Sequence, residues 1–85
     1  MPTEEDYRPI DCARHSEYEL AALRGTWLAL RWTSEGRIRH ACLQPQDLET
    51  RDGAEYLLAR DRQGHAHRIR LDRIQASAPC EGDAP

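Results

Sequence analysis

Residues 26–43 read TWLALRWTSEGRIRHACL, and this stretch decides the fold class. Apolar residues alternate in its first part, so that Leu28, Leu30 and Trp32 fall on one face, which is the period of a half-buried β-strand. The Ser-Glu-Gly sequence that follows is typical of a hairpin turn, and a second alternating run occupies residues 37–43. We therefore predict a β-hairpin with one apolar face. For its second strand, the sequence does not decide which face points inward.

Further short strands are predicted after this hairpin, between turn signals. The Gln-Pro-Gln sequence at 44–46 is expected to end the second strand, because proline interrupts strand pairing. The sequences DG at 52–53 and DRQG at 61–64 indicate tight turns. Alternation in the last segment places Ile69 and Leu71 inward. The expected segments are a short strand or turn at 47–51, strands at 54–60 and 65–71, and a final short strand that begins near residue 72.

One helix is predicted before the hairpin, at residues 16–23, which read SEYELAAL. Ser16 and Glu19 have the spacing of a capping box. Glu17 and Glu19 would then lie in the first turn, where the helix dipole favours acids. Gly25 suits the position just past the C-terminal end. The expected apolar face consists of Leu20, Leu23 and either Tyr18 or Ala21.

The predicted architecture is α+β, with an N-terminal helix packed on a small antiparallel barrel of five to six strands. A chain of 85 residues is long enough for one domain with a small core. The expected organisation is a disordered acidic lead at 1–6, the domain at 7–77 and a disordered tail at 78–85.

Charge is distributed unevenly along the chain. Residues 1–19 carry six acids and two arginines, residues 20–76 carry seven acids and ten arginines, and residues 77–85 carry two acids, for a net charge of −3. Such asymmetry fits either a solvated acidic terminus or a charged partner. The acids Asp11, Glu17 and Glu19 at the start of the helix are the candidate binding residues, and the partner would be basic.

A cytoplasmic location is expected from three observations. The N-terminus has no apolar segment typical of a secretory signal, and no apolar run reaches the length of a membrane span. The three cysteines, Cys12, Cys42 and Cys80, are odd in number and widely spaced, which argues against a disulfide framework. A reducing compartment fits free thiols.

Residue types used in catalysis and metal binding occur, but without the necessary spacing. No Cys-x-x-Cys pair is present, and His65 and His67 are expected to be solvated on one face of a strand. No glycine-rich loop precedes the helix, and no nucleophile motif is found. We therefore expect a binding protein that is not an enzyme and uses no metal or cofactor.

An alternative is a small RNA-binding barrel that uses arginines on its strands. The acidic balance of the whole chain disfavours this alternative, because nucleic-acid binders usually carry a basic excess. The arginines that would form the basic stripe are Arg31, Arg37, Arg39, Arg60, Arg62, Arg68 and Arg70.

Several short motifs together resemble one known family. They are YRPIDC at 7–12, YELA at 18–21, DL at 47–48, GAEYL at 53–57 and RLDRI at 70–74. Their order and spacing resemble the Rof family, the Rho-binding antiterminators, over about residues 7–76.

This resemblance implies an N-terminal helix on an Sm-like barrel. It also implies inhibition of Rho-dependent transcription termination, by binding the N-terminal domain of Rho at its primary RNA site and competing with RNA through an acidic surface. The expected partner is therefore Rho. The protein is expected to contact neither nucleic acid nor a membrane directly, and to be a monomer when it is not bound to Rho. By position, the contact residues would be Asp11, Glu17, Glu19, Tyr7 and Tyr18. The chain departs from the family at 13–16, where Arg14 is expected to oppose a basic groove.

Overall fold

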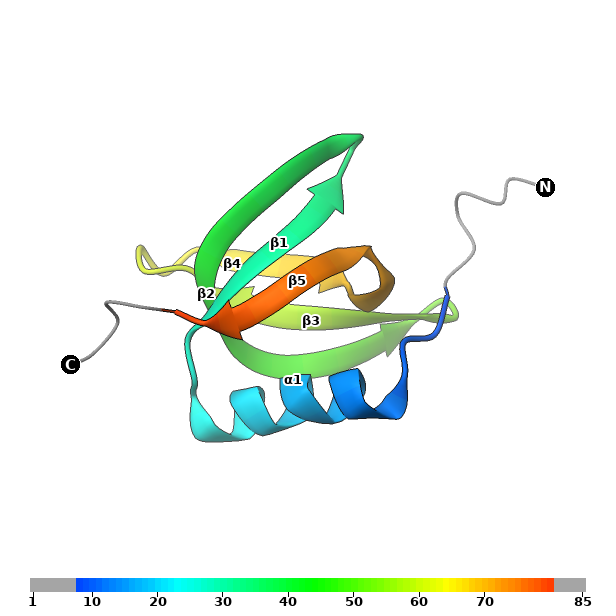
Figure 1. Cartoon of the computed structure of the whole chain (residues 1–85), viewed down its shortest axis with the longest axis horizontal. Helices are drawn as coiled ribbons and strands as arrows, with labels where there is room; N and C mark the ends of the chain where they lie inside the picture. Colours follow the sequence, from blue (N-terminus) through cyan, green and yellow to red (C-terminus); the bar gives the residue numbers. More distant parts are fainter. Residues whose placement is uncertain (1–7, 81–85) are drawn as a thin grey trace.

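The computed structural model describes residues 8–80, which form one helix followed by five strands (Figure 1). The predicted α+β class is confirmed. The acidic lead at 1–6 lies outside the described residues, as does most of the predicted tail. The elements are α1 (Cys12–Arg24), β1 (Leu28–Ser34), β2 (Arg37–Arg51), β3 (Ala54–Arg60), β4 (Ala66–Arg70), the short 3-10 helix η2 (Leu71–Arg73) and β5 (Ile74–Pro79).

The strands form one antiparallel sheet in the order β4-β3-β2-β1-β5. The edge strands β4 and β5 are consecutive in the chain and are connected by η2. No ladder joins these two strands in the described part of the chain, so the curved sheet is open. The helix α1 crosses below the sheet and packs mainly against β2 (Figure 1).

The second strand continues through the predicted break. Pro45 is buried and pairs with Ala59, and the register shifts between Pro45 and Asp47. Such a bulge inserts one extra residue, and it lets a strand bend where proline lacks an N–H donor. As a result β2 pairs with β1 through its first half and with β3 through its second half.

Two tight turns form where the sequence predicts them. Glu35 and Gly36 have φ angles of 52° and 78°, and Asp52 and Gly53 have φ angles of 52° and 81°. Two successive positive φ angles are the property of a type I′ turn, whose twist matches that of the flanking strands. These turns fix the registers of the β1–β2 and β2–β3 hairpins.

The helix begins four residues before the predicted start, so the capping box at Ser16 is wrong. Asp11 is the N-cap, and its Oδ1 accepts a hydrogen bond of 2.8 Å from the backbone N–H of Arg14. Gly25 ends the helix with φ of 70°, as predicted. In the described part of the chain, no helix has the length and apolarity needed to cross a bilayer.

The predicted apolar face of the helix is also largely wrong. Tyr18 and Ala21 face the sheet and are buried, whereas Leu20 and Leu23 are exposed. The strand predictions are more accurate, because Leu30, Trp32, Ile69 and Leu71 lie in the core as expected. Leu43 and Leu57, whose direction the sequence leaves undecided, also lie in the core. Tyr18 completes this core from the helix side.

Cys42 and Cys80 form a disulfide, which contradicts the expectation of free thiols. The two residues are 38 positions apart, but β2 and β5 both flank β1, and this brings them to a Cα separation of 6.0 Å. Strand β5 extends to Pro79, so residues 78–80 belong to the folded domain and not to a tail.

Candidate functional site on the helix

The acids predicted as binding residues lie on α1, but they do not gather at its N-terminal end. Because the helix begins at Cys12, Glu17 and Glu19 lie in its middle and its first turn contains no acid. Residues two apart on a helix differ by about 200° around the axis. Glu17 and Glu19 are therefore exposed on opposite flanks, and Asp11 is occupied as the N-cap.

The outer face of α1 is the side turned away from the sheet. Leu20 is 44% exposed and Leu23 is 83% exposed, and they are two of the few large apolar side chains at the surface. Exposed apolar residues bordered by charged ones are typical of protein contact surfaces. The outer face consists of Ala13, Ser16, Glu17, Glu19, Leu20, Leu23 and, at its C-terminal end, the exposed Arg24.

Tyr18 is fully buried, so its side chain is part of the core and cannot supply the predicted apolar contact. Tyr7, the other predicted aromatic contact, lies outside the described residues. The apolar area on the outer face comes instead from Leu20 and Leu23, which sequence reasoning had assigned to the core.

Arg14 is directed into the domain. Its guanidinium Nη2 donates a hydrogen bond of 3.0 Å to the hydroxyl of Tyr18 and another of 3.0 Å to the backbone carbonyl of Ile74. These contacts fasten α1 to the start of β5. Its positive charge is consequently absent from the outer face that carries Glu17 and Glu19.

A shallow groove separates α1 from the second half of β2. Its lining residues are Glu19, Ala22, Leu23, Gln46, Asp47 and Leu48. Asp47 adds a second carboxylate opposite Glu19, and no arginine lines the groove. The sequence gives no signal for this pair, because only the packing of helix on strand brings Glu19 and Asp47 together.

His15 connects the acidic side of α1 to the sheet. Its Nδ1 lies 3.7 Å from Oε2 of Glu19, and its Nε2 lies 3.6 Å from Oε1 of Glu55 on β3. Glu17, by contrast, makes no hydrogen bond or ion pair with residues 8–80. Neither glutamate on the outer face is therefore neutralised by an arginine of this part of the domain.

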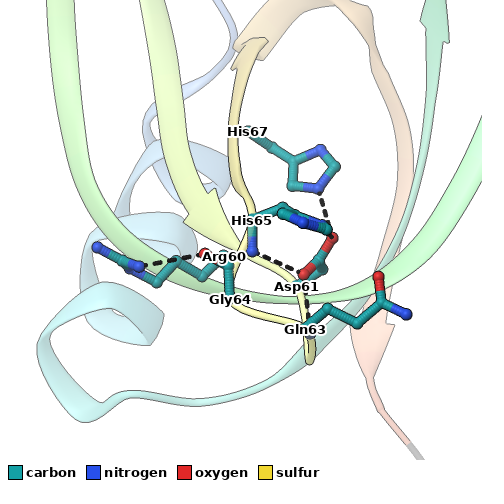
Figure 2. A network of polar contacts seen from close by, with 6 residues as sticks. All are labelled: Arg60, Asp61, Gln63, Gly64, His65 and His67. Carbon is teal, nitrogen blue, oxygen red and sulfur yellow. Dashed lines mark hydrogen bonds and ion pairs between the residues drawn. The ribbon is translucent and has the colours of Figure 1, made fainter.

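A separate polar network lies in the β3–β4 turn (Figure 2). Nε2 of His67 lies 3.1 Å from Oδ2 of Asp61, whose Oδ1 accepts backbone hydrogen bonds from Gln63 and His65, each of 2.9 Å. The hydrogen bond with His67, with help from the two N–H groups, lowers the pKa of Asp61 from 3.8 to about 2. Within residues 8–80, no group of three or more potential ligands is arranged to hold a metal ion. The hydrogen bonds of the Asp61 carboxylate hold the β3–β4 turn in its conformation.

Comparisons with protein-family models, with curated proteins and with solved structures find no match to this chain. The resemblance to the Rof family therefore stays a prediction that depends on the five short sequence motifs alone.

Proposed function

We propose that this protein inhibits Rho-dependent transcription termination by binding the N-terminal RNA-binding domain of Rho and competing with RNA. The observation that carries this proposal is the outer face of α1, where Leu20 and Leu23 lie between Glu17 and Glu19. The inward direction of Arg14 supports it, because only one arginine of the helix, Arg24 at its C-terminal end, then remains exposed beside these acids.

The expected contact combines two effects. Carboxylates that face a groove built for phosphates raise the association rate and make binding sensitive to salt. Exposed leucines add apolar burial, which slows dissociation. Glu19 and Asp47, on the two sides of the α1–β2 groove, extend the acidic surface from helix to sheet.

The scaffold would be an Sm-like one. Three features support this part of the proposal: the N-terminal helix, the strand order β4-β3-β2-β1-β5, and a 3-10 turn between the edge strands. The sheet itself is open in the described residues, so a closed barrel belongs to the proposal and not to the observed fold.

The alternative of an RNA-binding stripe across several strands is less well supported. Four of its seven arginines are engaged within the domain. Arg60 donates to the carbonyl of Gly64, Arg68 pairs with Glu49, and Arg70 pairs with Asp72. Arg62 lies over the ring of Trp27. A continuous stripe would need these four side chains to give up their contacts.

A binding assay with purified Rho, with and without RNA, tests the proposal. We expect the protein to bind Rho and to raise the apparent dissociation constant of the Rho–RNA complex. Replacement of both Glu17 and Glu19 by lysine should raise the dissociation constant for Rho at least about tenfold, which corresponds to roughly 1.4 kcal/mol.

The matched control is Glu35→Lys, which changes charge in the β1–β2 turn, far along the chain from α1. Its affinity for Rho should stay close to that of the unmodified protein. Equal losses in the helix and turn variants would remove the outer face as the contact surface. Binding that leaves the affinity of Rho for RNA unchanged would contradict the competitive mechanism.

A further inference from the structure

A second charged surface lies at the end of the β1–β2 hairpin, which extends beyond the rest of the sheet and away from α1 (Figure 1). It carries three exposed arginines, Arg31, Arg37 and Arg39, which we name the basic hairpin end. The acid among its neighbours is Glu35, in the turn itself. The local charge is therefore positive in a chain whose net charge is −3.

The hairpin arginines differ from the other strand arginines in having no partner. Within residues 8–80, Arg31, Arg37 and Arg39 make no hydrogen bond, ion pair or ring contact. The arginines on β3 and β4 and in the turn between these strands are engaged with carboxylates, carbonyls or rings. Since folding does not use these three guanidinium groups, they are available to a ligand.

The register places the three arginines on both faces of the β1–β2 hairpin. The hairpin is a narrow two-stranded ribbon only beyond Trp32, where the ladder with β5 ends, so Arg37 lies on the ribbon and Arg31 and Arg39 lie at its base. In the β1–β2 ladder, Arg31 lies opposite His40 with its side chain on one face, and Arg39 lies opposite Trp32 with its side chain on the other face. Arg37 lies two residues from Arg39 and therefore shares its face, about 7 Å away along the strand. A ligand that contacts all three must offer repeated negative charge on two sides of the ribbon.

Duplex DNA has this chemistry. Its major groove admits a two-stranded β-ribbon, with phosphates along both walls, whereas the major groove of A-form RNA is too narrow. Guanidinium groups suit phosphate because their forked donors match its oxygens.

Single strands fit less well, because they are usually held by stacking on aromatic rings. Trp32 is buried, and Trp27 lies 4.7 Å from the Arg62 guanidinium carbon, so neither ring is presented at the hairpin end.

We propose that the basic hairpin end binds the phosphate backbone of duplex DNA by entering its major groove, without reading sequence. This inference does not depend on the proposed function, because it concerns a different surface and needs no Rho. It departs from the expectation that the protein makes no direct nucleic-acid contact.

The test is fluorescence anisotropy of labelled 20-base-pair DNA duplexes of two unrelated sequences, titrated with the full chain at several salt concentrations. We expect dissociation constants of about 10–100 µM at low salt, equal for the two sequences. Three phosphate contacts predict a slope of log affinity against log salt of roughly −2.7. The double variant Arg37→Gln/Arg39→Gln should lose most of the affinity and reduce the slope to about −1.

The matched control is Arg24→Gln, because Arg24 is an exposed arginine on α1 that has no partner within residues 8–80. This variant should bind DNA nearly as well as the unmodified protein. Equal losses in control and hairpin variants would overturn the proposal. So would the absence of DNA binding at low salt, or equal or tighter binding of single strands, of A-form RNA duplexes or of a polyglutamate peptide. Circular dichroism of each variant confirms that the domain is folded.

Discussion

The outer face of α1 and the basic hairpin end carry opposite charges and are held in place differently. Among residues 8–80, Glu17 and Glu19 are unpaired with arginine on the helix, and Arg31, Arg37 and Arg39 are unpaired on the hairpin. Between them, acids and arginines of the sheet neutralise one another, as Glu49 does with Arg51 and Arg68. The sign of the charges left unpaired, rather than the net charge, therefore decides which partner each surface suits.

The two surfaces also differ in what supports them. The helix is joined to the sheet by the buried ring of Tyr18 and the two hydrogen bonds of Arg14. The hairpin is held by its own backbone ladder, and the disulfide ties its β2 strand to β5. Substitutions can therefore loosen one support and leave the other in place, which allows the comparison to be tested.

Tyr18→Ala is expected to have the largest effect. Loss of a fully buried aromatic ring costs about 3–5 kcal/mol, because the transfer free energy is lost and a cavity remains. Urea unfolding followed by circular dichroism measures this cost. Tyr18→Phe keeps the ring and loses only the hydrogen bond from Arg14, for about 1 kcal/mol. Similar losses in both variants would mean that the ring does not anchor the helix.

Replacement of Cys42 and Cys80 by serine should come next. Removing a cross-link between residues 38 positions apart lowers the free energy of unfolding by about 2–4 kcal/mol. Hydrogen exchange should rise first in β5, whose side chains are mostly exposed. Cys12→Ser is the control and should stay within about 0.5 kcal/mol, since Cys12 is free and exposed. Titration of three reactive thiols in the native protein would contradict the cross-link.

Asp61→Asn is expected to have the smallest effect, and a pH-dependent one. The pKa of Asp61 is lowered from 3.8 to about 2, so its charge stabilises the fold above pH 3.8 and stops doing so as pH falls through 2. The variant should melt a few degrees lower at pH 7 and approach the unmodified protein near pH 2. Thermal melts across this range measure the difference. A difference independent of pH would show that the charge has no part in it.

The sequence predicts features set by local geometry. Alternation identifies the inward positions of β1, and the Glu-Gly and Asp-Gly pairs identify both type I′ turns. It fails where tertiary packing decides. The sequence predicts Ser16 as the cap, but Asp11 is the N-cap, because the docking of Tyr18 and Arg14 on the sheet extends the helix to Cys12.

The candidate site was predictable only in part, for the same reason. Glu17 and Glu19 are exposed as expected, but the outward direction of Leu20 and Leu23 follows from which side of α1 meets β2. The Cys42–Cys80 pair depends on strand order, which spacing along the chain does not reveal. Pro45 was read as a strand end because a bulge has no reliable local signature.

Cys12 provides a site for the selective labelling of α1. It lies exposed at the first position of the helix, and it is the one cysteine of the three that is outside the disulfide. A maleimide dye would therefore attach at a single site under non-reducing conditions. A change in the emission of the dye would report the binding of a protein to the helix. The hairpin would remain unlabelled, so DNA binding could be measured separately on the same protein.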